Sequence, residues 1–213
     1  MGREAQSRLY VVAAAGTDPQ ALAAALDVAD VAALLIVPGP DGQLTAASAR
    51  PLVELVQPRG IAALIENDAG LVRALRADGV HLAWSKDIVA RYREARDVLG
   101  TRFIVGADAG RLRHDAMTLG EAGVDYVGFG IPPHVEDRAS AAERRLDLIA
   151  WWSEIFELPC VAFDVDSIED ASALAAAGAD FVAVHANVAG GPSELLGFAK
   201  AVAQAATGPE AMA

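Results

Sequence analysis

Residues 122–130 read Ala-Gly-Val-Asp-Tyr-Val-Gly-Phe-Gly, and this stretch shows the junction on which the whole chain is built. It places Gly123 directly after a stretch with helical spacing and starts an apolar run at Val124. Glycine adopts the left-handed conformation that ends a helix at little cost, so the pattern predicts a helix C-terminus followed by a strand. Gly79, Gly100 and Gly178 occupy the same place at other junctions of the chain.

Eight apolar runs of this kind occur, each followed by a stretch with helical spacing. The runs are continuous rather than alternating, which is typical of strands that are covered on both faces. Asp18-Pro19, and Ser167 followed by Asp170, are helix start signals in two of the intervening stretches. The runs begin near Leu9, Val31, Ile61, Val80, Phe103, Val124, Cys160 and Phe181.

This alternation predicts an α/β fold, a single-domain (β/α)8 TIM barrel over residues 1–206, with a frayed tail over 207–213. An open doubly wound sheet is the alternative arrangement of the same units. The first predicted strand–helix turn, Ala15 to Asp18, lacks the three-glycine fingerprint of dinucleotide binding, so a nicotinamide-binding version of that sheet has little support.

Composition restricts the class of function. The 213 residues carry a net charge of -12, which opposes binding to nucleic acid or to an acidic membrane surface. Cys160 is the only cysteine, which excludes an internal disulfide and a multi-cysteine zinc site. No apolar stretch reaches the roughly 20 residues that span a bilayer. We therefore expect a cytoplasmic protein with a small-molecule ligand.

Polar residues follow the apolar runs, where parallel barrels bind their ligands. Several of these residues also have a purely structural interpretation. Asn67-Asp68 is an ordinary helix N-cap pair, and Gly190 to Ser193 can either hold a phosphate on backbone N–H groups or form a turn. His81 lies inside an apolar run and is expected to be a buried core histidine. Trp151-Trp152 offers packing or a subunit contact, which leaves a homodimer open.

The motifs from the third predicted strand onward follow a recognisable order and spacing, over roughly residues 60 to 188. They are Ile65-Glu66-Asn67-Asp68, Ala77 to Leu82, Gly123 to Gly130, Pro159 to Ala162, and Ala177 to Asp180. In this order and spacing the chain resembles the thiamine phosphate synthase family.

The resemblance implies a transferase of thiamine biosynthesis, which joins a pyrimidine diphosphate to a thiazole phosphate and releases pyrophosphate with the help of Mg²⁺. It also implies a dissociative reaction, in which a carbocation-like pyrimidine forms as pyrophosphate leaves. Catalysis then rests on charge neutralisation and positioning. The resemblance implies that Asp68 and Asp87 are metal ligands, that Lys86 and Arg138 are catalytic cations, and that Asn67 and Asp108 bind substrate. The glycine-rich opening of the last predicted helix adds Gly190, Gly191 and Ser193 as substrate-binding candidates.

Several positions depart from the family pattern. Leu34 to Pro40 contain no cation where the family binds pyrophosphate, and Ala69 replaces an arginine. Asp164 and Val165 stand where paired glycines would hold the thiazole phosphate. Because carboxylates repel phosphate unless a metal intervenes, two alternatives stay open. One is a diverged barrel that binds another small ligand or a divalent cation in its acidic mouth, and the other is a non-catalytic partner subunit.

Overall fold

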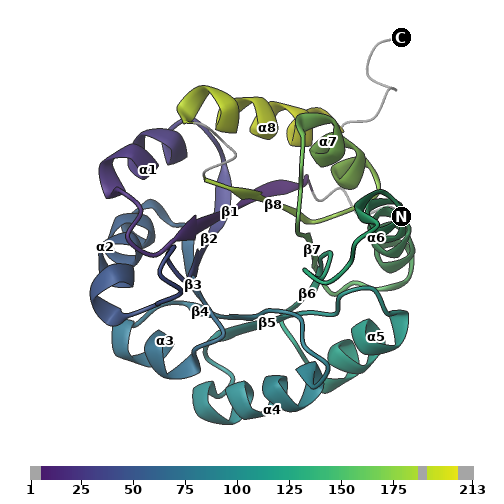
Figure 1. The fold of residues 1–213 in the computed structure, drawn as a ribbon, viewed down its shortest axis with the longest axis horizontal. Helices are drawn as coiled ribbons and strands as arrows, with labels where there is room; N and C mark the ends of the chain where they lie inside the picture. Colours follow the sequence, from purple (N-terminus) through teal and green to yellow (C-terminus); the bar gives the residue numbers. More distant parts are fainter. Residues whose placement is uncertain (1–5, 187–190, 206–213) are drawn as a thin grey trace.

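The structure, a computed structural model, describes residues 6–186 and 191–205. Eight parallel strands close into a barrel in sequence order, and the helices surround it (Figure 1). The predicted barrel is therefore confirmed, and the open-sheet alternative is wrong. The predicted tail at 207–213 lies outside the described residues, as does Gly190. No helix of the described part is long and apolar enough to cross a membrane.

The elements alternate along the chain without exception. The strands are β1 (Arg8–Ala14), β2 (Val31–Val37), β3 (Ala62–Glu66), β4 (Gly79–Leu82), β5 (Ile104–Asp108), β6 (Tyr126–Phe129), β7 (Cys160–Ala162) and β8 (Phe181–His185). The helices are α1 (Pro19–Leu26), α2 (Ala46–Val56), α3 (Ala69–Leu75), α4 (Ile88–Leu99), α5 (Arg113–Ala122), α6 (Arg138–Ile155), α7 (Ile168–Ala176) and α8 (Pro192–Ala205), with a short 3-10 turn at Gln57–Arg59.

Most start and stop signals of the sequence act as expected, but the prediction for Gly79 is wrong: α3 ends at Arg76, and Gly79 is the first residue of β4. The Asp18 side chain accepts a hydrogen bond from the backbone N–H of Gln20 and caps α1. Ser167 does the same for Asp170 at the start of α7. Gly123 ends α5 with a φ of 91°, a conformation that most other residues adopt only with strain.

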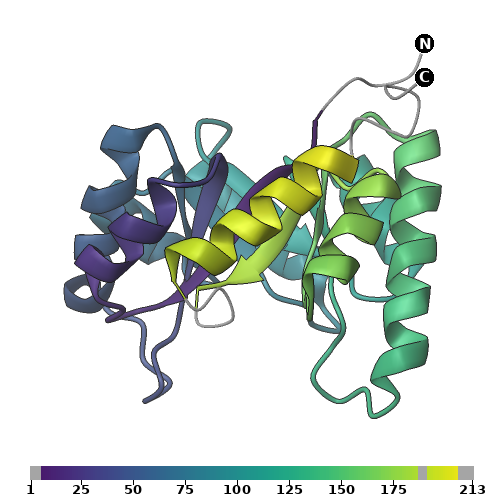
Figure 2. The same cartoon turned by 90° about the horizontal axis from the view of Figure 1, so that it is seen from above.

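Apolar side chains form two layers. One layer fills the inside of the barrel, and the other lies between the strands and the helices. Figure 2 shows α8, drawn in yellow, lying against the outside of the barrel wall beside α7. The interior layer consists of Tyr10, Val12, Ala33, Leu35, Leu64, Tyr126, Val161, Phe163 and Ala183. Both faces of the strands are thus buried, which explains their continuous apolar runs.

An aspartate directly precedes each even-numbered strand, at the end of the barrel where the strands begin. Each of the four carboxylates reaches the start of the odd-numbered strand before it. Three accept a backbone N–H, and the fourth pairs with an arginine side chain. The pairs are Asp78 with Ala63 N at 2.8 Å, Asp125 with Val105 N at 2.7 Å, Asp180 with Cys160 N at 2.8 Å, and Asp30 with the Arg8 guanidinium at 2.7 Å.

Candidate active site

A cavity of about 270 Å³ opens at the opposite end, where the strands finish. Its polar lining comes from the ends of five strands and the residues that follow them. These residues are Glu66, His81, Asp108, Asp164 and His185. Apolar side chains such as Val12, Leu35 and Phe163 complete the lining, and the described lining residues include no lysine or arginine. Three of the carboxylates expected at this mouth, those of Glu66, Asp108 and Asp164, therefore line the cavity.

Asp108 ends β5 and points into this cavity. Its Oδ1 accepts hydrogen bonds from the backbone N–H groups of Gly110 at 2.6 Å and Gly130 at 3.2 Å. Burial raises the pKa of this carboxyl to about 6, and the nearby Asp164 carboxylate adds to the rise, although the two hydrogen bonds oppose it. Of the eight predicted site residues within the described part of the chain, only Asp108 lines the cavity.

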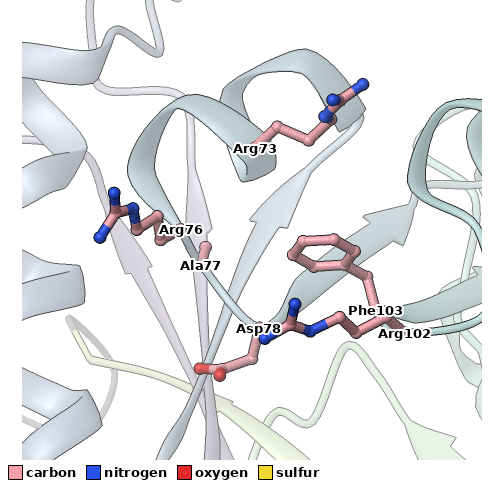
Figure 3. Close-up of a pocket in the computed structure, with 6 residues that line it drawn as sticks. All are labelled: Arg73, Arg76, Ala77, Asp78, Arg102 and Phe103. Carbon is pink, nitrogen blue, oxygen red and sulfur yellow. The ribbon is translucent and has the colours of Figure 1, made fainter.

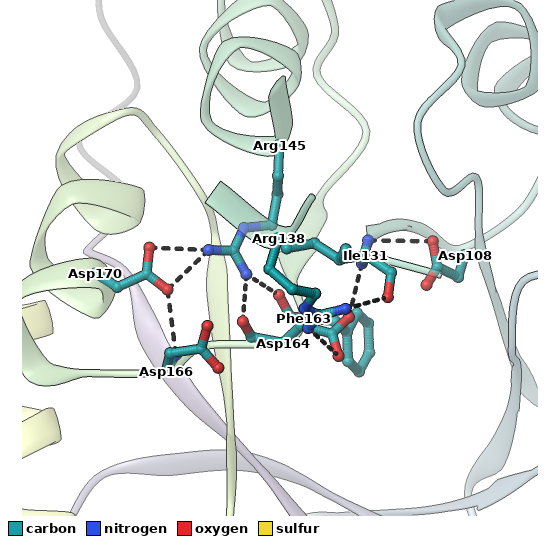
Figure 4. A network of polar contacts seen from close by, with 9 residues as sticks. Asp108, Ile131, Arg138, Arg145, Phe163, Asp164, Asp166 and Asp170 are labelled. Carbon is teal, nitrogen blue, oxygen red and sulfur yellow. Dashed lines mark hydrogen bonds and ion pairs between the residues drawn. The ribbon is translucent and has the colours of Figure 1, made fainter. Parts of the chain in front are cut away.

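Asp164 follows β7 and lies beside Asp108. The two carboxylates flank Gly130, since a Cβ placed on that glycine would lie 2.5 Å from Asp108 Oδ2 and 2.9 Å from Asp164 Oδ2. Asp164 has a left-handed backbone with a φ of 57°. Its Oδ2 accepts the N–H of Ile131 at 2.7 Å, and its Oδ1 lies 3.9 Å from the Arg138 guanidinium (Figure 4). Asp164 thus occupies the backbone donor of Ile131 and lies next to the positive charge of Arg138.

A buried arginine on α6 holds this loop in place. Arg145 is 1% exposed and donates to the backbone carbonyls of Phe163 and Asp164. Its other terminal nitrogen binds both carboxylate oxygens of Asp170, at 2.7 and 2.8 Å (Figure 4). Because the planar guanidinium holds its two terminal nitrogens at a fixed angle, these contacts fix direction as well as distance. Arg145 therefore connects α6 and α7 to the segment that carries Asp164.

His81 lies at the floor of the cavity, as a core histidine. It is 3% exposed, and its Nδ1 is 2.9 Å from the hydroxyl of Tyr126, which is in turn 3.0 Å from the hydroxyl of Tyr10. Burial lowers the pKa of His81 to about 3, so the ring is neutral at physiological pH. The expectation of a buried interior histidine is confirmed, and a polar chain continues from it into the barrel.

Asn67 and Asp68 follow β3 and have structural partners. Asp68 caps α3, because its Oδ1 accepts the N–H of Leu71 at 2.8 Å. Asn67 has a φ of 58°, and its Oδ1 accepts the N–H of Ala83 at 3.0 Å. The same oxygen receives a second hydrogen bond, at 2.7 Å, from Arg91 on α4. Arg91 brings a positive charge to the rim between β3 and β4.

The remaining predicted residues lie on the rim, outside the cavity lining. Lys86 and Asp87 are exposed at the start of α4, and Asp87 makes no side-chain capping bond. Arg138 begins α6 and donates to the Ile131 carbonyl at 3.2 Å. Gly191 is a turn residue with a φ of 116°, and Ser193 is exposed in the first turn of α8.

Sequence reasoning missed Arg91 and Arg145, which lie on helices with other charged residues. It also missed the contact between His134 and Trp84, a residue of the cavity lining; the two ring centroids are 5.1 Å apart. Nothing in the local spacing distinguishes Arg91 from its exposed neighbour Arg93. Trp152, by contrast, is fully buried and stacks on Phe156, so it packs in the core.

A divalent cation was expected on Asp68 and Asp87. Within the described residues, no group of three or more His, Cys, Asp or Glu side chains is placed to hold a metal ion. Mg²⁺ commonly uses only one or two carboxylates and completes its shell with water and substrate phosphates. Asp68 keeps its Oδ2 outside the cap hydrogen bond, so the donor chemistry of the pair suits such an open site.

Together, the closed barrel and the cavity at the carboxyl ends of its strands define a barrel protein whose candidate site lies at the end where such barrels bind their ligands. Residues 9–188 match the protein family described as thiamine monophosphate synthase. The chain belongs to this family.

Individual relatives agree with the family assignment. The thiamine-phosphate synthase of Rhodospirillum centenum is 39% identical over 189 residues, covering 85% of this chain and 88% of the relative. That of Erythrobacter litoralis is 34% identical over 212 residues, covering 95% and 98%. Among solved structures, the thiamine phosphate pyrophosphorylase of Pyrococcus furiosus superposes with a TM-score of 0.74 at 18% identity, covering 95% of this chain and 98% of that one. This structural likeness supports the fold.

Proposed function

We propose that the mouth of this barrel joins hydroxymethylpyrimidine diphosphate to thiazole phosphate and releases pyrophosphate. Family membership across residues 9–188 is the observation that carries the proposal. The position of the polar cavity, at the carboxyl ends of the strands, agrees with it. The chemistry requires cations near the leaving pyrophosphate and a place for positive charge on the pyrimidine.

The cations stand on the rim rather than in the cavity. Arg91 is placed beside Asn67, and Arg138 lies at the start of α6 beside Asp164. With the exposed Lys86 they supply positive charge for phosphate groups that extend out of the cavity. Asp68 and Asp87 would hold Mg²⁺, which neutralises the charge of a diphosphate when bound. The diphosphate end of the substrate would therefore point outward, toward β3 and β4.

The carboxylates of the cavity suit the other half of the reaction. As pyrophosphate leaves, positive charge develops on the pyrimidine, and a nearby carboxylate stabilises that charge in a site that excludes water. Asp108 is fixed for this role by two backbone N–H groups. Glu66 lies in the same cavity, and burial raises the pKa of its carboxyl. The acidic lining thus favours the cationic intermediate while it disfavours phosphate inside the cavity.

The direct test is pyrophosphate release by the purified chain given both substrates and Mg²⁺. We expect turnover that requires both substrates. Arg91→Met should reduce turnover tenfold or more, because it removes a rim cation and the partner of Asn67. Arg93→Met is the matched control, since Arg93 is an exposed arginine on the same helix. Absence of pyrophosphate release from folded protein would refute the proposal, as would equal effects of the two substitutions.

A further inference from the structure

A second cavity lies at the other end of the barrel, where the strands begin. It has a volume of about 580 Å³ and is lined by Arg73, Arg76, Ala77, Asp78, Arg102 and Phe103 (Figure 3). We call it the basic pocket. Arg73 and Arg76 come from the end of α3, while Arg102 and Phe103 directly precede β5. The basic pocket is therefore separate from the mouth, because parallel strands begin at one end of the barrel and finish at the other.

The three arginines of the basic pocket have no carboxylate partner among residues 6–186 and 191–205. Within the described residues, their guanidinium groups make no ion pair or hydrogen bond. Some other arginines of this chain do, as Arg96 shows with Asp125 and Arg145 with Asp170, whereas Arg93 and Arg144 make no ion pair within the described residues. The clustering is notable in a chain with 29 acidic and 17 basic residues, where a carboxylate partner would be easy to supply.

The single acidic residue of the pocket is already engaged. Asp78 Oδ2 accepts hydrogen bonds from Ala63 N at 2.8 Å and from Gln57 Nε2 at 3.2 Å. Arginine in the last turn of a helix also complements the helix dipole, which accounts for Arg73. It accounts in the same way for Arg76, the C-cap residue of α3, but not for Arg102, which lies outside any helix.

The backbone conformation of Arg76 is a further unusual feature of the basic pocket. Arg76 ends α3 in a left-handed conformation, whereas Gly123 ends α5 in the same region of φ and ψ. Glycine is the residue that takes this conformation with least strain. At the end of α3 the chain instead carries a long cationic side chain beside the pocket.

We propose that the basic pocket binds a phosphorylated small molecule that carries a flat ring, of the nucleoside diphosphate type. Guanidinium groups pair with phosphate oxygens in a planar, bidentate manner, and three of them suit a diphosphate. Phe103 supplies an aromatic ring, which in the view of Figure 3 lies between the side chains of Arg73 and Arg102. The volume is within the range of small-molecule sites. This site would act independently of the mouth.

Titration calorimetry with ADP and adenosine tests the proposal. We expect ADP to bind the full chain with a micromolar dissociation constant and adenosine to bind at least tenfold more weakly. The variant R73Q/R76Q/R102Q should weaken ADP binding tenfold or more. Its matched control is R50Q/R93Q/K200Q, which removes the same charge from exposed positions on three other helices and should bind ADP as the unmodified chain does.

Three further measurements test whether ADP binds at the basic pocket. Pyrophosphate should bind R73Q/R76Q/R102Q more weakly than it binds the unmodified chain. This loss should be smaller than the loss for ADP, because ADP also has a base that contacts Phe103. Raising NaCl from 50 to 500 mM should weaken ADP binding to the unmodified chain about tenfold, which needs no variant. Pyrophosphate release from the substrates of the mouth should not change in R73Q/R76Q/R102Q. ADP binding that is absent, salt-independent, equal to that of adenosine, or unchanged in this variant overturns the proposal.

Discussion

Replacing Arg145 by methionine should destabilise the protein more than any exposed charge replacement. The substitution keeps an apolar stem of similar length but removes the donors to Phe163, Asp164 and Asp170. Breaking a buried ion pair typically costs about 3–5 kcal/mol. The Asp170 side chain is 25% exposed, so water partly solvates the carboxylate left behind. We therefore expect a loss of about 3 kcal/mol in the free energy of unfolding.

For a domain of this size, such a loss lowers Tm by about 6–12 °C. Thermal unfolding followed by tryptophan fluorescence measures it, with Arg144→Met as the control. Arg144 is the preceding residue on α6, and within the described residues its side chain makes no ion pair.

The double variant R145M/D170A gives the sharper test. Asp170→Ala alone leaves a buried guanidinium without its counter-ion, whereas the double variant has no stranded charge. The double variant should therefore unfold at a higher temperature than D170A. If the two losses simply add, or if R145M is no less stable than R144M, the reasoning about this buried pair is wrong.

Three other expectations follow from the cavity. The folded pKa of Asp108, about 6, exceeds the ordinary 3.8, so ionisation of this carboxyl destabilises the folded state as pH rises through this range. Asp108→Asn should therefore raise Tm at pH 8 but not at pH 3.5. An equal gain in Tm at both pH values would contradict this expectation. The folded pKa of His81, about 3, is below the ordinary 6.5, so the neutral ring stabilises the folded state above pH 6.5, and this stabilisation is lost as pH falls toward 3. Tm should therefore fall less between pH 7 and pH 5 in His81→Gln than in the unmodified chain. Asp164→Gly suits the positive φ, frees the Ile131 N–H and removes a carboxylate that repels phosphate. Calorimetry should therefore show at least tenfold tighter binding of thiazole phosphate. No gain in affinity, or an equal gain in Asp166→Gly, would contradict this argument.

The fold could be predicted from the sequence because its signals are local. The apolar runs, the capping residues Asp18 and Ser167, and the helix-ending Gly123 each act within a few residues. Together they define eight strand–helix units, the number that a closed barrel of this kind requires, and the structure shows the closure. The burial of His81 could be predicted for the same reason, since its two neighbours along the strand are apolar.

The site was predicted less completely, because its geometry depends on contacts between distant segments. Arg91 reaches Asn67 from 24 positions away, and Arg145 reaches Asp164 from 19. Only the rotation of a helix about its axis decides which arginine faces the mouth. The roles given to Lys86 and Asp87 stay predictions, because both side chains are exposed on the rim.

The four aspartates at the start of the even-numbered strands divide the barrel into quarters. Each quarter consists of an odd strand, its helix and the following even strand, joined by one carboxylate. The ring is thus a fourfold pseudo-repeat, and the sequence repeats most clearly around Asp125 and Asp180, where Ala-Gly-x-Asp is followed by an aromatic residue and a valine. The chain should accordingly tolerate new termini between quarters better than within them, because an opening between quarters leaves every carboxylate joined to its own strand by continuous chain. Three of these aspartates also belong to the motifs that mark the family. Those motifs therefore include residues that hold neighbouring strands together, at the end of the barrel opposite the candidate active site.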